Sequence, residues 1–179
     1  MKQLKILTAS LLALLLFTFS QCKKKIEEPQ LPSETTTGAM TFGCKINGKV
    51  FVPKDGRGKP GLFCQYVYLG SGVGGGWYLN IPAVDWNPSS IPAVSITTDS
   101  LLVSENSTYQ FKYRKKGFPG AFYSDGPQYN ATDNNSGELK IKKFDSVNRI
   151  ISGTFFFTGT DNSNGQTVNI TDGRFDIRY

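Results

Sequence analysis

The fold is decided by one stretch of sequence, Thr41-Phe42-Gly43-Cys44-Lys45-Ile46-Asn47-Gly48-Lys49-Val50-Phe51-Val52-Pro53. An Asn-Gly pair between two alternating runs predicts a two-residue type I′ hairpin turn, because both residues tolerate a positive φ. This turn pairs Ile46 with Lys49 and Cys44 with Phe51. The residues that then share one face, which we expect to be the core face, are Phe42, Cys44, Ile46 and Phe51.

Period-two alternation continues along the rest of the chain and is interrupted by turn residues. The strands that we expect span residues 41–46, 49–53, 62–69, 77–83, 93–98, 108–114, 121–124, 128–132, 138–144, 150–158 and 167–179. No segment has helical spacing with caps, and only 98–105 could hold a short helical turn. About ten antiparallel strands in one domain predict an all-β fold, either a sandwich or a barrel-like domain.

The alternation also predicts which residues of these strands face solvent. In the last strand we expect Phe175, Ile177 and Tyr179 to point one way and their polar neighbours the other, with a kink at Asp172-Gly173. The basic clusters at 112–116 and 140–143 alternate with apolar residues, so we expect them to lie on the wet faces of strands.

The N-terminus has the layout of a bacterial lipoprotein signal peptide. Two lysines precede an apolar stretch at 6–20, and Cys22 follows shortly after it. The stretch is too short to span a bilayer and lacks an A-x-A-like cleavage site. We therefore expect cleavage before Cys22 and acylation of its thiol with palmitate. This divides the chain into a signal peptide (1–21), a disordered tether (22–38) rich in charge, Pro, Ser and Thr, and a β-domain (39–179).

The residues after Cys22 predict the cellular location of the lipoprotein. Residue 23 is Lys rather than Asp, and by resemblance to the lipoprotein sorting rule this favours the outer membrane. The run 25–28 also resembles the Lys-then-acidic export signal of Bacteroidetes surface lipoproteins, which implies exposure on the cell surface. Three lysines beside the acyl chains would contact anionic headgroups and strengthen attachment to the membrane.

Composition excludes several classes of function. The chain contains no histidine, which excludes Ser-His-Asp and Cys-His catalysis and any metal site that uses imidazole. The net charge of +6 is spread along the chain and does not predict nucleic-acid binding. We expect no cofactor and no metal. Cys44 and Cys64 are expected to form a disulfide in an oxidising compartment, and the alternative is two buried reduced thiols.

Several motifs have a plainer interpretation as turns. The segment 70–76 contains G-x-G-x-x-G, but a strand-like run follows it where a dinucleotide site needs a helix, so we interpret it as a loop. The segments 133–137 and 161–165 look like fragments of calcium loops, but they lack the spaced Gly and the bidentate Glu. We expect both to be turns.

Three aromatic residues lie in or beside turn-rich segments, namely Trp86, Tyr123 and Tyr129. Aromatic rings on loops can contact a ligand or anchor an interface. The alternative is that these rings cap the ends of the core. Ser100 and Ser146 follow Asp and precede an aliphatic residue, which resembles the acceptor pattern of Bacteroidetes O-glycosylation.

The opening at 41–53, just after Leu31-Pro32, is similar to that of a family of Bacteroidetes outer-membrane lipoproteins of unknown function. The runs 137–145, 150–155 and 170–176 are similar as well, whereas 60–130 is only loosely so. The resemblance implies an all-β domain anchored to the outer membrane, and it supplies no catalytic residues.

The sequence therefore predicts a non-enzymatic, membrane-anchored lipoprotein whose β-domain binds a protein or glycan partner. Two alternatives stay open: a glycan hydrolase that uses carboxylates alone, and a purely structural component of the envelope. A cleft with two close carboxylates and aromatic rings would favour the hydrolase. An exposed aromatic patch without such carboxylates would favour the binding protein, and a charged surface with neither would favour the structural component.

Overall fold

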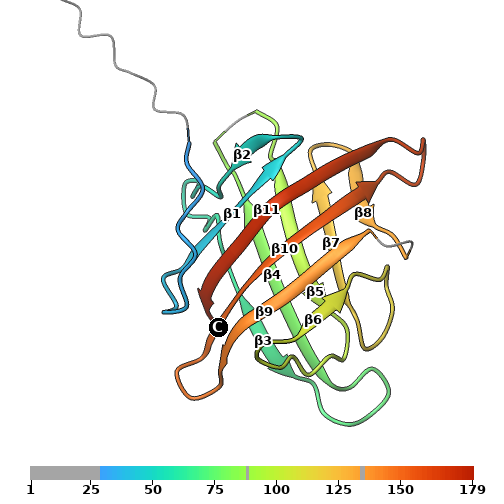
Figure 1. The fold of residues 1–179 in the computed structure, drawn as a ribbon. Coiled ribbons are helices and arrows are strands. Elements are labelled where there is room, and N and C mark those ends of the chain that lie inside the picture. The colour runs from blue at the N-terminus through green and yellow to red at the C-terminus, as the bar shows by residue number, and fades with distance from the viewer. Residues whose placement is uncertain (1–28, 88, 134–135) are drawn as a thin grey trace, which may run out of the picture.

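The computed structural model describes residues 29–87, 89–133 and 136–179 (Figure 1). The regular structure in these ranges is β throughout, which confirms the predicted fold class. The strands are β1 (Thr41–Ile46), β2 (Lys49–Phe51), β3 (Gln65–Tyr68), β4 (Trp77–Val84), β5 (Ala93–Thr98), β6 (Thr108–Gln110), β7 (Pro119–Ser124), β8 (Gln128–Ala131), β9 (Gly137–Asp145), β10 (Ile150–Thr160) and β11 (Thr167–Arg178). The helical turn considered for 98–105 is not formed. Within the described ranges no helix is long and apolar enough to cross a membrane.

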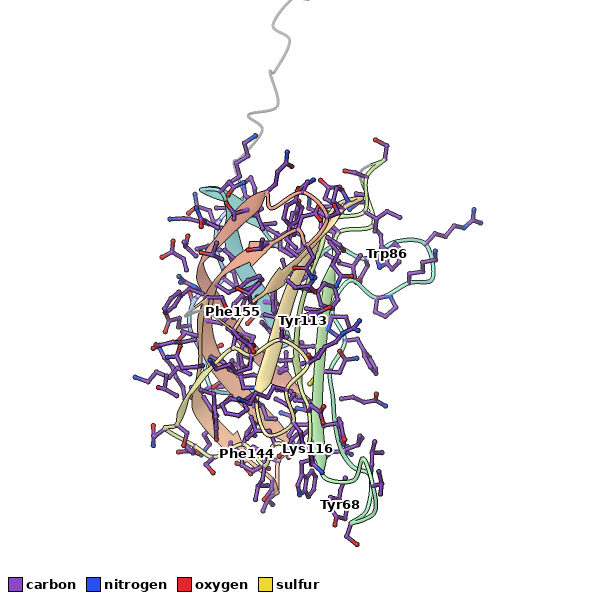
Figure 2. The ribbon with its side chains drawn as sticks, turned by 90° about the vertical axis from the view of Figure 1, so that its right-hand side faces the viewer. Tyr68, Trp86, Tyr113, Lys116, Phe144 and Phe155 are labelled. Carbon is purple, nitrogen blue, oxygen red and sulfur yellow. The ribbon has the colours of Figure 1, made fainter. Side chains whose placement is uncertain are left out.

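All strands pair antiparallel in one sheet that branches at β10. The main order is β2-β1-β11-β10-β8-β7-β5-β4-β3, while β9 also pairs with β10, and β6 pairs with β9. Along β10, residues 150–157 pair with β9 and only Gly159 and Thr160 pair with β8. We call β2, β1, β11, β10, β9 and β6 the first layer, and β8, β7, β5, β4 and β3 the second layer. The first layer crosses in front of the second in Figure 1, and the two are seen edge-on in Figure 2, as in a sandwich or barrel-like domain.

A short segment after β2 ties the two layers together at one end. Lys54 forms an isolated parallel bridge with Asp85, just past the end of β4. Its amide donates to the carbonyl of Val84 (3.0 Å), and its carbonyl accepts from the amide of Trp86 (3.1 Å). The edge of the first layer is therefore hydrogen-bonded to the second layer, and the end of the domain near these residues is partly closed.

The first hairpin has the predicted register. Ile46 pairs with Lys49 and Cys44 pairs with Phe51 across an Asn47-Gly48 turn in which both residues have positive φ. Phe42, Cys44 and Phe51 belong to the buried core, and Ile46 packs against it. The turn chemistry and the alternation thus place the same residues inward, as expected.

The last strand contains the predicted kink. Asp172 has φ 53°, and the register of β11 against β10 shifts between Phe155 and Phe157. Gly173 is required here, because a Cβ would lie 2.5 Å from the carbonyl oxygen of Phe155. Beyond the kink, Phe175 and Ile177 point into the core, as predicted.

The segment 29–38 corrects the expected boundary of the β-domain. It has no regular secondary structure, but it runs beside β1 and ends in close contact with β11 (Figure 1). The carboxylate of Asp176 accepts hydrogen bonds from the hydroxyls of Thr35 and Thr37 and from the backbone amides of Thr37, Gly38 and Ala39. This part of the expected tether packs on the β-domain, because it supplies donors to a buried carboxylate. The rest of the tether and the signal peptide, with Cys22, lie outside the described residues.

Candidate functional site: a basic groove on the second layer

A groove of about 510 Å³ lies on the outer face of the second layer. Its floor comes from β5, β7 and β8. Thr97 pairs with Gly120, and Phe122 pairs with Asn130, so these four positions lie side by side across the three strands. Their neighbours along each strand point into the core, which leaves the floor positions facing outward. The lining residues of the floor are Thr97, Gly120, Phe122, Gln128 and Asn130.

The wall of the groove is the segment 111–118, between β6 and β7. We predicted a strand over 108–114, but β6 ends at Gln110 and Arg114 has φ 48°. The prediction was wrong after residue 110 because this segment turns back along β7. The amide of Lys112 donates to the carbonyl of Pro119 (2.9 Å), and the amide of Tyr113 donates to Oδ1 of Asp133 (2.7 Å). The wall is thus hydrogen-bonded to Pro119, the first residue of β7, and to Asp133.

Positive charge dominates the lining of this groove. Lys112, Arg114 and Lys115 line it together with one carboxylate, that of Asp99. The Nζ of Lys112 donates to the carbonyl of Asp133 (2.8 Å). Neither Arg114 nor Lys115 forms an ion pair with a carboxylate in the part of the chain that the structure describes. The groove therefore presents cations that are free to bind an anionic group.

Aromatic rings lie directly beside these cations. The guanidinium carbon of Arg114 is 5.2 Å from the ring centroid of Tyr113, and the Nζ of Lys115 is 5.1 Å from that of Phe118. Both distances are in the range of cation–π interactions. Tyr113 is 36% exposed. The groove thus combines flat apolar surfaces with positive charge.

The groove lacks the groups that two-carboxylate hydrolysis requires. Among the described residues that line it, Asp99 is the single carboxylate, whereas a glycosidase of that type needs an opposed pair. Residues 29–87, 89–133 and 136–179 also contain no group of three or more His, Cys, Asp or Glu side chains placed to hold a metal ion. The arrangement is suited to binding through charge and stacking.

From the sequence we predicted that both basic clusters, 112–116 in the wall and 140–143 elsewhere, lie on the solvent-facing sides of strands. For 140–143 that interpretation is confirmed, because these residues lie in β9. For 112–116 it is wrong. The available signal was that Gly117 and Pro119 follow the cluster 112–116 closely, which is typical of a turn.

The three aromatic residues singled out from the sequence do not form one site. Tyr123 and Tyr129 stack with ring centroids 5.9 Å apart. Tyr123 belongs to the core and Tyr129 packs against it. Burial, and then the charge of Asp125, raise the pKa of Tyr123 to about 12. None of the three lines the basic groove, but Tyr123 reaches a second, smaller cavity at the closed end of the domain.

Trp86 lies just past the end of β4, beside the 56–60 loop that projects from the domain in Figure 2. Its Nε1 donates to the carbonyl of Pro60 (3.0 Å), and the Nζ of Lys59 lies 4.6 Å from its ring centroid. Gly56 packs so closely on it that a Cβ there would be 2.7 Å from the Cβ of Trp86. The ring is partly exposed and holds the 56–60 loop in place.

Cys44 and Cys64 are free thiols in the structure, so the expected disulfide is not formed there. Both are buried, and burial raises the pKa of each thiol to about 12. In this structure they pack as small apolar side chains.

The two serines proposed for glycosylation differ in accessibility. The hydroxyl of Ser100 donates to the carbonyl of Gly75 (2.6 Å) and lies against the glycine-rich loop 70–76. That loop leads directly into β4, as expected from the sequence. Ser146 is exposed in the β9–β10 turn. Only the second hydroxyl therefore points to an open surface.

The structure is a β-domain that carries a groove lined by basic and aromatic side chains. Residues 90–176 match a family described as a domain of unknown function, DUF6252. The match runs from just before β5 into β11 and includes every residue that lines the groove. No curated protein and no solved structure matches the chain.

Proposed function

We propose that this protein is a lipid-anchored binding protein of the outer membrane, and that its β-domain holds an acidic glycan in the basic groove. The observation that carries the proposal is the pair Arg114 and Lys115, which lie on aromatic rings and have no ion-pair partner in the described part of the chain. An uronate or sulfate group suits these cations, because guanidinium and ammonium groups bind oxyanions by charge-assisted hydrogen bonds.

The rest of the groove suits a sugar chain. Tyr113 and Phe122 offer flat apolar surfaces against which a sugar ring can pack, while Gln128 and Asn130 offer amide donors and acceptors. An opening of about 510 Å³ lies within the range of ligand sites. The proposal assigns no chemical step to the protein, since binding alone accounts for these groups.

The proposal of a lipid anchor is supported by the sequence. The lysines, the apolar stretch and Cys22 support a lipoprotein of the Bacteroidetes type that the sequence resembles, attached through an acylated cysteine. If so, radiolabelled palmitate enters the wild-type protein in cells, and Cys22→Ser removes the label because the acyl group has no thiol acceptor. A labelled Cys22→Ser protein would show that the anchor has been misassigned.

The groove is tested by binding of the purified full-length protein to a sulfated polysaccharide, a uronate polymer and neutral dextran. We expect the two acidic polymers to bind and dextran not to bind, with an affinity that falls as salt is added. The double variant Arg114→Ala/Lys115→Ala should weaken binding at least tenfold.

The matched control is Arg57→Ala/Lys140→Ala, which removes the same charge from exposed positions that do not line the groove. It should change the affinity by less than threefold. Equal losses in the two double variants would indicate non-specific attraction by net charge. Equal binding of dextran would overturn the choice of an acidic ligand.

A further inference from the structure

The basic part of the groove wall is a short bend, Arg114-Lys115-Lys116, that is fixed at both of its ends. Before the bend, the amide of Tyr113 donates to Oδ1 of Asp133 (2.7 Å). After the bend, the amide of Gly117 donates to the main-chain carbonyl of Asp99 (2.7 Å). The cations of the bend therefore lie between two hydrogen bonds to distant parts of the chain.

The bend contains a backbone conformation that needs support. Arg114 has φ 48°, in the left-handed region that residues with a Cβ disfavour. A residue in this conformation persists where the surrounding contacts hold it, and such residues cluster at functional sites. The hydrogen bond between Tyr113 and Asp133 is made by the residue directly before Arg114. This bond is therefore placed to hold the turn.

Asp133 acts on the wall through two different groups. Its carboxylate accepts from the amide of Tyr113, and its main-chain carbonyl accepts from the Nζ of Lys112 (2.8 Å). Asp133 itself is exposed and does not line the groove. As an anion it weakens the positive potential of the groove, so its charge alone would disfavour an acidic ligand. A favourable effect of this carboxylate on binding would therefore have to come from its hydrogen bond.

We infer that Asp133 is a positioning residue of the basic groove, whose Oδ1 holds the wall in the turn that presents Arg114 and Lys115 to an anionic group. This inference rests on the proposed function of the groove. A wall that is already in its binding conformation loses less conformational entropy when a ligand binds, which increases the affinity. Without the acceptor, the bend can leave the left-handed conformation and carry its cations away from the floor formed by β5, β7 and β8.

Two substitutions of Asp133 separate its hydrogen bond from its charge. Asp133→Ala and Asp133→Asn both remove the negative charge, but only Asn keeps an acceptor oxygen for the amide of Tyr113. In the full-length protein, Asp133→Ala should weaken binding of dextran sulfate and polygalacturonate by about fivefold or more, because preorganisation is lost. Asp133→Asn should stay within about threefold of the wild type, because the hydrogen bond is kept. Equal affinities of the two variants, whether above or below that of the wild type, would overturn the inference.

The matched control is Glu105→Ala. Glu105 is also an exposed carboxylate that accepts a hydrogen bond from a backbone amide, that of Phe144 (3.0 Å), but it does not line the groove. The control removes one negative charge and one hydrogen bond of the same kind, and it should leave the affinity within about threefold of the wild type. A loss as large as that of Asp133→Ala would show that the effect does not arise in the wall, and the inference would fail.

Hydrogen exchange distinguishes failure of this inference from failure of the proposed function. In the free protein, the amide of Tyr113 should exchange about threefold or more faster in Asp133→Ala than in the wild type, while Asp133→Asn keeps the protection. If the wild type binds neither acidic polymer, the proposed function fails, and the exchange rates still show whether Asp133 holds the wall. An unchanged exchange rate in Asp133→Ala would refute the positioning role even if both polymers bind.

Discussion

The hydroxyl of Thr35 donates a 2.6 Å hydrogen bond to Oδ2 of Asp176, which lies 141 positions later in the chain and is only 1% exposed. The amides of Thr37 (2.9 Å) and Gly38 (2.8 Å) donate to the same carboxylate. Asp176 is on the side of β11 that faces away from the core, so the segment 29–38 is what buries it. Several donors on one charged group make this contact strong, because hydrogen bonds to ionised groups contribute about 1.5–3 kcal/mol each.

We predict that Asp176→Asn lowers the free energy of unfolding by about 2–3 kcal/mol, the size of one or two charged hydrogen bonds. The amide keeps one acceptor oxygen but loses the charge and the second acceptor. Urea unfolding followed by tryptophan fluorescence measures the change.

The matched control is Asp172→Asn, in the same strand. Asp172 is exposed and forms a surface ion pair with Lys45 (3.1 Å), and Asn tolerates its positive φ. This variant should stay within about 1 kcal/mol of wild type, as exposed ion pairs usually do. Equal losses in the two variants would show that the carboxylate of Asp176 has no special role in stability.

The same carboxylate predicts a loss of stability in acid. Burial alone would raise the pKa of Asp176, but the hydrogen bonds from Thr35, Thr37, Gly38 and Ala39 outweigh it and lower the pKa. A carboxyl group whose pKa is lowered in the folded state stabilises the protein above its unfolded pKa of about 3.9. That contribution is lost as the pH falls through the folded pKa. The free energy of unfolding should therefore drop below about pH 4 and drop less steeply in Asp176→Asn, whereas parallel curves would contradict this role.

Truncation tests the corrected boundary of the domain. A chain of residues 39–179 should be less stable than one of residues 29–179 by about 2–3 kcal/mol, the size of one or two charged hydrogen bonds, because the truncation removes the donors from Thr35, Thr37 and Gly38 and exposes the carboxylate of Asp176 to water. Both chains should give β-type circular dichroism spectra. Equal melting temperatures would show that the segment 29–38 does not hold Asp176 in solution.

The two cysteines give a direct test of the thiol state. Because burial raises the pKa of both thiols to about 12, neither should react with a disulfide reagent at pH 8 in the folded protein. In urea without reductant both should react, which gives two thiols per chain in the segment 29–179. No reaction in urea would establish instead the disulfide that the sequence led us to expect.

Trp86 and Trp77 should respond differently to substitution. Trp77 stacks on Tyr66 with centroids 4.8 Å apart and packs against the core, whereas the indole of Trp86 is hydrogen-bonded to Pro60 on the 56–60 loop. We expect Trp86→Ala to cost about 1–2 kcal/mol, one hydrogen bond and part of the apolar area of the ring. Trp77→Ala should cost about 3 kcal/mol or more. A larger loss for Trp86→Ala would place its ring in the core.

The strands could be predicted from the sequence where the turn residues and the alternation of apolar residues both favour the same pairing and the same buried face. The Asn47-Gly48 turn sets the register of the first hairpin, and the alternation around Phe175 sets the inward face of the last strand. The count of about ten strands is close to the eleven in the structure. Both features depend on neighbours in sequence, which is why period-two reasoning recovers them.

The basic groove, which we propose as a binding site, could not be predicted from the sequence in the same way. The groove depends on the wall segment leaving β6 and turning back along β7, which is fixed by contacts such as that between Tyr113 and Asp133. The buried state of Asp176 depends on Thr35, at the other end of the chain. Local alternation carries no information on either contact, because the partners are distant in sequence and meet only in the folded domain.

The hydrogen bonds at Asp176 also have a mechanical consequence. The chain before Pro29 joins the sheet through the segment 29–38, whose last residues are held at Asp176 on β11. β11 pairs with both β1 and β10, so it is an interior strand of the first layer. A force that pulls on the N-terminus would therefore act on the interior strand β11 before it acts on β1. The domain should then resist mechanical unfolding better than a domain that is pulled through an edge strand.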